Sequence, residues 1–277
     1  VAGLRRHAQT AGGDAGGGTL VEHAFVIAEV AGCHDGDQDK AARLIELAAD
    51  IGSDACKFQW LSSPERLVER RGAPEYLVAY RTLAFPRDWL PALKHLCDAA
   101  RIEFMVTVYL PEDVDTIAPY VERFKVASFE GEIGDLSSAL VRHRKPVLYS
   151  TGMNMIQCPV GDGYQRIQRL HCVSAYPAPL DEMNLAVLRE PSYVGLSDHS
   201  RHLWTGALAI AAGARVVEFH VRLQDTEPTN ADFAVAFAPE EARAYVANLR
   251  LAERMLGDGR KRVMPCEKPF LRYRVRP

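Results

Sequence analysis

Hydrophobic and polar positions along the chain follow two alternating patterns from Phe25 onward. Short runs rich in β-branched residues, such as FVIAEVAG at 25–32 and VVEFHVRL at 216–223, are typical of strands. Longer stretches between most of them repeat apolar residues every three or four positions, which predicts amphipathic helices. Eight strands that alternate with helices over about 250 residues predict a closed (β/α)8 TIM barrel of the α/β class. A doubly wound open sheet is the alternative.

The predicted elements form one barrel with an additional segment at each end. We expect strands at 25–32, 55–59, 103–109, 123–129, 145–151, 167–173, 192–198 and 216–223, and helices at 39–52, 86–100, 111–122, 136–143, 203–213 and 239–256. Residues 61–85, rich in charge and proline, are predicted to be a long surface loop over the barrel mouth. Residues 152–166 leave room for about one helical turn. We divide the chain into a flexible N-terminal arm (1–20), the barrel (21–257) and a C-terminal tail (258–277).

Composition narrows the classes of partner. The net charge of −3 argues against nucleic acid or an anionic membrane as the main partner. No stretch approaches the ~20 apolar residues of a membrane-spanning helix, and residues 1–20 lack the apolar core of a signal peptide. The six cysteines show no CxxC spacing and are expected to be reduced and buried. These features predict a cytoplasmic protein that acts on small molecules.

The run VVEFHVRL places ionisable groups in a strand that is predicted to be buried. Glu218 and His220 lie on one face of this strand, and Val217, Phe219 and Val221 lie on the other. Burying a carboxylate and an imidazole without partners costs free energy. Each group therefore needs a hydrogen-bonding partner, or the interior holds a charged ligand such as a metal ion or a substrate.

Two lysines are also predicted inside strands of a parallel sheet, where a solvated side chain would be out of place. One interpretation of Lys57 and Lys125 is structural, with salt bridges to Glu29 or Glu130. The other interpretation is a site for a phosphate or a phosphorylated carboxylic acid. Hydroxyl groups at the ends of neighbouring strands favour this second interpretation, namely Thr107, Ser128, Ser150 and Ser197.

Two histidines come from neighbouring predicted strands. His199 follows the seventh strand and His220 lies in the eighth, so both imidazoles can approach one ion. Two histidines with an oxygen ligand and water suit a divalent metal such as Mn²⁺, Fe²⁺, Co²⁺ or Zn²⁺. A histidine taken alone is more often a satisfied core residue. Two histidines at matching positions of neighbouring strands favour a metal site over two separate core histidines.

Longer motifs resemble the sialic acid synthase family, which makes N-acetylneuraminate and related nonulosonates. AEVAGCHDG, DACKFQ, FKVAS, KPVLYSTGM, LHCVSAYPAP, VGLSDHS, GARVVEFHVRL and FAPEE occur in the family's order between Phe25 and Leu256. The resemblance implies a TIM-barrel transferase that condenses phosphoenolpyruvate with the aldehyde of an N-acyl sugar. It also implies a divalent metal, with Mn²⁺ first and Mg²⁺, Co²⁺, Fe²⁺ or Zn²⁺ as alternatives.

The resemblance assigns roles to individual residues. His199 and His220 would bind the metal, and Glu29 would handle water as the candidate base. The residues that it assigns to phosphoenolpyruvate are Lys57, Thr107, Lys125, Ser128, Ser150 and Ser197, and those that it assigns to the acceptor are Tyr176 and Asp232. Three further polar residues at strand ends complete the expected site: Ser174 for phosphoenolpyruvate, and Gln59 and Tyr109 for the acceptor.

Departures from the family cluster on the acceptor side. The family's paired asparagines after the fourth strand are replaced around Glu132 and Ile133, and an asparagine that often follows the HC dipeptide is Ser174. The family's antifreeze-protein-like domain, which follows the barrel and supplies an arginine to a partner subunit, is expected to be missing. A homodimer is one assembly that the resemblance allows. We therefore expect an acceptor other than N-acetylmannosamine, such as a sugar or aldehyde from a specialised pathway.

Two other functions stay open at this point. One is a metal-dependent pyruvate aldolase or another phosphoenolpyruvate-using synthase. The other is a non-catalytic barrel that binds a phosphorylated metabolite. Phosphate release separates the condensation from the aldolase, because a pyruvate aldolase produces no phosphate.

Overall fold

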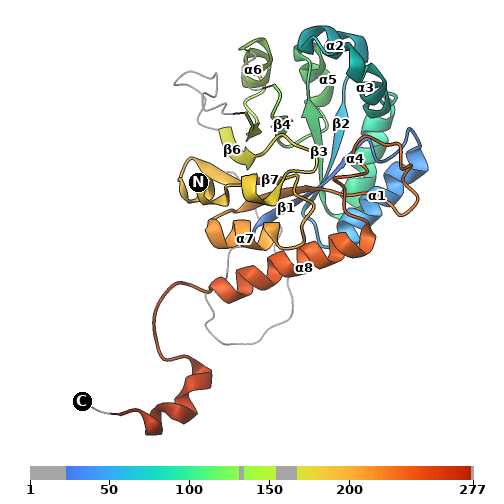
Figure 1. Ribbon diagram of the computed structural model, residues 1–277. Helices are drawn as coiled ribbons and strands as arrows, with labels where there is room; N and C mark the ends of the chain where they lie inside the picture. Colours follow the sequence, from blue (N-terminus) through green and yellow to red (C-terminus); the bar gives the residue numbers. More distant parts are fainter. Residues whose placement is uncertain (1–22, 131–133, 154–166, 276–277) are drawn as a thin grey trace.

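Eight parallel strands close into a barrel in the order of the sequence (Figure 1). The computed structural model describes residues 23–130, 134–153 and 167–275. The strands are β1 Phe25–Ala31, β2 Ala55–Trp60, β3 Glu103–Val108, β4 Phe124–Val126, β5 Val147–Thr151, β6 Ile167–Cys172, β7 Tyr193–Asp198 and β8 Val216–His220. All eight were predicted from the pattern of hydrophobic positions, and β4 is shorter than expected. The predicted (β/α)8 barrel is confirmed, and the open sheet is excluded because β8 pairs with β1.

Helices cover the outside of the barrel where amphipathic patterns were found. They are α1 Gln38–Asp50, α4 Trp89–Ala100, α5 Val114–Ile117, α6 Gly134–Val141, α7 Thr205–Ala212 and α8 Pro239–Leu256. Helix α8 has the predicted bounds, and Glu241 accepts a hydrogen bond from the backbone N–H of Ala238 at its start. The expected helix at 111–122 is broken into a 3-10 turn, Pro111–Asp113, and the short α5. Pro119 explains the early end, because proline cannot donate to the helix and restricts the residue before it.

Residues 61–85 form a helical insert, so the prediction of a long loop is wrong. The insert contains α2 Pro64–Arg71, a 3-10 turn Pro74–Tyr76 and α3 Leu77–Leu83. Ser63 caps α2 by accepting from the N–H of Arg66, and Gly72 ends it at φ 61°, where a residue without Cβ avoids strain.

An apolar cluster attaches the insert to the barrel mouth, which is where the sequence analysis placed residues 61–85. Leu67, Tyr80 and Leu83 of the insert pack with Tyr109 and Leu110, which follow β3. The loss of water from these side chains stabilises the two helices on the barrel. The insert therefore forms a fixed wall beside the carboxyl ends of the strands.

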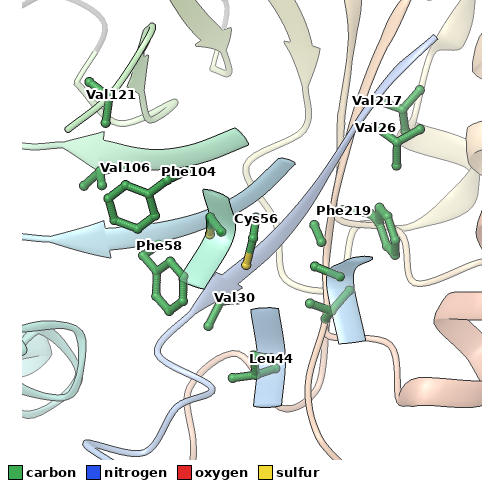
Figure 2. Packing of buried hydrophobic residues seen from close by; sticks show 14 of the residues in the cluster. Val26, Val30, Leu44, Cys56, Phe58, Phe104, Val106, Val121, Val217 and Phe219 are labelled. Atoms are coloured by element: carbon green, nitrogen blue, oxygen red, sulfur yellow. The ribbon is translucent and has the colours of Figure 1, made fainter. Parts of the chain in front are cut away.

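The strands divide their side chains between two cores. Outward-facing residues pack under the helices, and Figure 2 shows part of this outer core, where Phe58 and Phe104 lie with ring centroids 5.9 Å apart. Val217 and Phe219 of β8 also belong to the outer core. A smaller inner core fills the bottom of the barrel with Ile27, Ala55, Met105, Leu148, Leu170 and Val216. The alternation predicted for β8 is therefore confirmed.

The remaining segments lie away from the barrel interior. Two 3-10 helices, Leu180–Glu182 and Leu185–Arg189, connect β6 to β7. The C-terminal residues 258–275 are exposed, carry a 3-10 helix at Pro265–Tyr273 and extend beyond α8 (Figure 1). The predicted N-terminal arm and most of 152–166 lie outside the described residues. The division into arm, barrel and tail stays a prediction.

Two expectations from composition can be compared with the structure. Among the residues described, no helix is both long enough and apolar enough to cross a lipid bilayer. Cys33, Cys56, Cys97 and Cys172 are buried free thiols, as expected, but Cys266 is exposed on the C-terminal segment. Cys158 lies outside the described residues.

Candidate active site at the carboxyl ends of the strands

A polar layer lies directly above the apolar inner core. It is reached by moving two residues along each strand, because alternate residues face the same side. Ile27 is followed by Glu29, Ala55 by Lys57, Met105 by Thr107 and Val216 by Glu218. Strand pairing sets Glu29 beside both Lys57 and His220, Thr107 beside Lys125, and Ser197 beside Glu218. Residues far apart in the sequence thus meet in one ring.

The two lysines lie in this ring and are almost completely buried. Lys57 forms an ion pair with Glu29 and donates a hydrogen bond to Thr107 Oγ1 at 2.6 Å. Lys125 donates to Ser150 Oγ at 2.8 Å and to the carbonyl of Val126 at 3.0 Å. The structural interpretation is thus correct for the pairing of Lys57 with Glu29.

Glu218 bridges the two lysines, and the sequence reasoning did not include it among the site residues. Its Oε2 lies 3.7 Å from Lys57 Nζ, and its Oε1 lies 3.6 Å from Lys125 Nζ. Ser197 donates to Oε1 at 2.9 Å. Burial alone would raise the pKa of Glu218, but the charges of Lys125 and Lys57 outweigh it and lower that pKa. Burial lowers the pKa of Lys57 to about 7, against the opposing charge of Glu218.

His199 and His220 come together above this ring. Their ring centroids lie 5.3 Å apart. His199 donates its Nδ1 proton to the carbonyl of Val173 at 2.8 Å, which leaves the lone pair on Nε2. Burial, together with the neighbouring His220, lowers the pKa of His199 to about 3, so this imidazole is neutral at pH 7.

Two of the predicted acceptor residues lie beside the histidines. Tyr176 packs on His199 with ring centroids 4.1 Å apart. Asp232 Oδ1 lies 3.4 Å from His220 Nδ1, and Asp232 Oδ2 accepts from the N–H of Gly32 at 3.3 Å. Burial would raise the pKa of Asp232, but His220 outweighs it and the pKa is lowered. Asp232 therefore carries a negative charge next to the imidazole pair.

The other two predicted acceptor residues lie on the Glu29 side. Tyr109 donates to Gln59 Oε1 at 2.5 Å, and Gln59 donates to Glu29 Oε1 at 3.0 Å. The N–H of Ala31 also donates to Glu29 Oε1, at 2.9 Å. Glu29 is thus oriented by an amide, a backbone N–H and Lys57. The four acceptor candidates form two pairs, one at each side of the polar ring.

Ser128 and Ser174 form a hydroxyl pair at the ends of β4 and β6. Ser174 donates to Ser128 Oγ at 2.8 Å. Gly152, just after β5, lies against this pair: a Cβ there would lie 2.0 Å from Ser174 Oγ and 3.0 Å from Ser128 Cβ. Only a residue without a side chain fits at that position. The structure therefore brings these two predicted site residues together.

A second buried ion pair closes the side of the site nearest the helical insert, and the sequence reasoning did not find it. Arg71 of α2 pairs with Glu130, which follows β4, through its Nε at 2.9 Å and its Nη2. The predicted alternative of a salt bridge between a strand lysine and Glu130 is therefore wrong. Arg71 also donates to Tyr80 Oη at 2.8 Å. In the sequence, ERR on an expected loop is indistinguishable from a solvated charge run.

The described residues contain no group of three or more His, Cys, Asp or Glu side chains arranged to hold a metal ion. His199 and His220, with ring centroids 5.3 Å apart, are the two residues that the sequence assigned to a metal.

Comparison with known families agrees with this arrangement. The model of the NeuB family matches residues 44–261. The chain belongs to the NeuB family. It is similar to an uncharacterized protein of Methanocaldococcus jannaschii, with 32% identity over 90% of this chain and 77% of that protein. It is also similar to the N,N'-diacetyllegionaminic acid synthase of Campylobacter jejuni, with 29% identity over 88% of this chain and 80% of that enzyme.

A solved structure in the same family has the same architecture. The chain superposes on the N-acetylneuraminic acid synthetase of Leptospira borgpetersenii, crystallised with citrate, with a TM-score of 0.81. Sequence identity is 26%, and the match covers 91% of this chain and 92% of that one. The family resemblance drawn from the motifs is thus confirmed for the barrel of this NeuB-family chain.

Proposed function

We propose that this NeuB-family protein is a transferase that condenses phosphoenolpyruvate with the aldehyde of a sugar-like acceptor, giving a 2-keto-3-deoxy acid and phosphate. The observation that carries the proposal is the buried ring in which Lys57, Lys125 and Glu218 lie below the His199 and His220 pair. The named relatives, which make legionaminic and N-acetylneuraminic acids, support the same class of reaction.

The donor side follows from the charges of the ring. Two buried ammonium groups can neutralise a phosphate and a carboxylate that lie between them. Burying such a cluster of charges costs free energy, and the ion pairs within it add little to the stability of the fold. This favours a functional role for the cluster. Hydroxyl contacts to these charges support the proposal, because Thr107 contacts Lys57, Ser150 contacts Lys125 and Ser197 contacts Glu218. We assign the paired hydroxyls of Ser128 and Ser174 to phosphoenolpyruvate as well. Glu218 lies at nearly equal distances from the two ammonium groups, 3.7 Å from Lys57 and 3.6 Å from Lys125.

The donor set fits a divalent metal. The Nδ1 proton of His199 is held by a carbonyl, which fixes the tautomer that leaves Nε2 free to bind a metal. The carboxylate of Asp232 lies 3.4 Å from Nδ1 of His220. His199 and His220 would hold Mn²⁺, or alternatively Mg²⁺, Co²⁺, Fe²⁺ or Zn²⁺, with oxygen ligands from substrate and water. A bound divalent ion would polarise the acceptor carbonyl as a Lewis acid.

The residues of the chain then account for the other steps. Carbon 3 of the enol attacks the acceptor's carbonyl carbon: a new C–C bond forms, the carbonyl π bond opens to an oxyanion, and carbon 2 becomes an oxocarbenium centre. Water adds to carbon 2, and Glu29 takes its proton as the general base and passes it to the oxyanion, because Gln59, the Ala31 N–H and Lys57 orient its carboxylate. The C–O bond from the tetrahedral carbon to phosphate then breaks, the departing phosphate takes the hydroxyl proton, and the ketone of the product forms. Gln59, Tyr109, Tyr176 and Asp232 orient the acceptor at the two sides of the ring.

The compartment of this reaction is proposed from the thiols. None of the five described cysteines is in a disulfide, which suits the reducing conditions of the cytoplasm.

We propose an acceptor other than N-acetylmannosamine, since the family's asparagine after the HC dipeptide is Ser174, which here pairs with Ser128.

The test is phosphate release from a defined mixture. The protein is incubated with phosphoenolpyruvate, Mn²⁺ and a panel of sugar aldehydes, and phosphate is expected with at least one of them. Mixtures without acceptor serve as the control, and chelation followed by each metal in turn is expected to abolish and then restore the activity. Consumption of pyruvate without phosphate would identify an aldolase. Tight binding of phosphoenolpyruvate with no phosphate from a broad panel would identify a binding protein.

A further inference from the structure

Two consecutive arginines attach the helical insert to the connection between β4 and α6. Arg70 pairs with Asp135 at the start of α6, with Nη1 on Oδ2 at 2.9 Å and Nη2 on Oδ1 at 2.5 Å. Arg71 pairs with Glu130 directly after β4. Helix α2 is therefore attached both to the residue range after β4, through Glu130, and to the start of α6, through Asp135. The two pairs differ in burial, because the Asp135 side chain is 55% exposed and the Glu130 side chain is 0% exposed.

The two pairs also differ in how the carboxylate is used. Arg70 engages both oxygens of Asp135, which is the usual fork geometry of an arginine with a carboxylate. Arg71 places both its Nε and its Nη2 on Oε1 of Glu130. Oε2 of Glu130 is buried and has no hydrogen-bond partner among the described residues. A buried carboxylate oxygen left unpaired is costly, which indicates that a ligand supplies its donor.

Arg71 also contacts the acceptor side of the site. Its guanidinium carbon lies 5.3 Å from the ring centroid of Tyr109 and 5.2 Å from that of Phe129. Tyr109 in turn donates to Gln59, which donates to the proposed base Glu29. The donors of Arg71 are occupied by Glu130 and Tyr80, so it has little left to offer a ligand directly. Its effect on a ligand passes through the groups that it holds.

We propose that Arg71 is a positioning residue of the acceptor site, which selects an acceptor whose group at this corner is an uncharged hydrogen-bond donor. The inference rests on the proposed function. Arg71 binds Oε1 of Glu130, which leaves Oε2 available to the acceptor, and it holds the Tyr109 ring by a cation–π contact. A hydroxyl or amide N–H satisfies the free oxygen. A phosphate or carboxylate at the same place is repelled by it.

The main experiment compares lysine replacements at the two neighbouring arginines. Arg71→Lys keeps the charge but loses the planar fork and the stacking surface. We expect the acceptor KM to rise about tenfold, with kcat and the Kd of phosphoenolpyruvate changed by less than about twofold. Arg70→Lys changes the other ion pair of α2 and is expected to leave all three values unchanged. Phosphoenolpyruvate binding is measured by calorimetry without acceptor.

A double-mutant cycle guards against a variant that fails to fold. Arg71→Met leaves Glu130 as an unpaired buried charge, so it is combined with Glu130→Gln, which removes that charge. Both single variants are expected to raise the acceptor KM, and the double variant to raise it by less than the product of the two effects. If the rise in acceptor KM of the double variant equalled the product of the two single rises, Arg71 would not act through Glu130.

A pair of acceptors tests the selection by charge. The best neutral acceptor and its phosphate ester are compared, and we expect kcat/KM to favour the neutral sugar at least tenfold, with Glu130→Gln narrowing the difference. A preference for the phosphate ester in the wild type would overturn the selection.

Other outcomes separate this inference from the proposed function. If the wild type turns over and Arg70→Lys impairs it as Arg71→Lys does, then both arginines only attach α2 and the inference is wrong. If Arg71→Lys weakens phosphoenolpyruvate binding as much as acceptor binding, it is wrong as well. If the wild type neither binds phosphoenolpyruvate nor releases phosphate, the proposed function fails and the inference fails with it.

Discussion

Two layers of the barrel interior, built by the same strands, differ in what they contribute. The lower layer consists of apolar side chains such as Met105 and Leu170. The upper layer, two residues further along, holds Lys57, Lys125 and Glu218 in equally deep burial. Burying apolar surface stabilises the fold, whereas burying charges gains little even when they are paired. The comparison indicates that the lower layer serves stability and the upper layer serves binding and chemistry.

The largest expected effect follows from removing one charge of the upper layer. Lys125→Met is expected to lower kcat/KM for phosphoenolpyruvate by about 10²–10³-fold, because one donor to the anion is lost while the volume is kept. The variant should still unfold cooperatively. Steady-state kinetics and thermal unfolding measure the two effects. Lys94→Met, on the surface of α4 where Lys94 pairs with Asp98, is the matched control and should change neither.

If Lys125→Met kept full activity, the upper layer would have no part in donor binding.

The lower layer is expected to show the opposite behaviour. Met105→Ala removes a completely buried side chain from the inner core and should lower the free energy of unfolding by about 2–5 kcal/mol. The kcat of the folded protein should stay within about threefold of the wild type, because Met105 does not face the polar ring's ligands. Chemical denaturation measures the stability. Met255→Ala, at a position 78% exposed on α8, is the control and should cost less than about 0.5 kcal/mol.

If Met105→Ala lost activity but kept its stability, the lower layer would serve the chemistry and the assignment of stability to it would be wrong.

A smaller effect tests a buried imidazole outside both layers. His34 packs among Phe58, Phe85 and Trp89 on the outer face, and burial lowers its pKa to about 4. The folded pKa lies below the unfolded value of about 6.5, so the unfolded state binds more protons between these values. Stability from this neutral imidazole is present above pH 6.5 and is lost as the pH falls to about 4, by about 3 kcal/mol in total.

Denaturation of the wild type and of His34→Gln between pH 7 and 4 measures this contribution as the difference in slope. His199 titrates with a lowered pKa as well, but it is present in both proteins and cancels. Equal slopes would show that His34 does not remain neutral in the folded state.

Most of the barrel could be predicted because its elements follow local patterns. All eight strands and helix α8 were found from periodicity, and Glu218 and His220 were placed on one face from the alternation of β8. The helical insert was missed because its two helices are only 8 and 7 residues long, too short for a clear apolar period, and are stabilised by contact with Tyr109 and Leu110. The caps Ser63 and Gly72 were the local signals that could have revealed α2.

The pairing of charges could not be predicted for a related reason. A salt bridge from Lys57 to Glu29 was one of the interpretations left open by the sequence, and it forms because the two residues lie opposite each other on neighbouring strands. Arg71 reaches Glu130 across 59 positions of sequence only because α2 folds back over β4. Nothing in the residues around Arg71 distinguishes it from Arg70, and the two side chains are about equally exposed; only the burial of their partners differs.

The sequence by itself determined the elements, the inward face of each strand and the set of polar groups on that face, because a strand's alternation is local and has a period of two. The tertiary structure alone decided which of these groups pair and which stay unpaired. Closure of the barrel brought Glu218 between Lys57 and Lys125, and docking of the insert left one oxygen of Glu130 without a partner among the residues that the structure describes. The reason is physical: pairing depends on distances of a few ångströms between separate elements, which only packing sets.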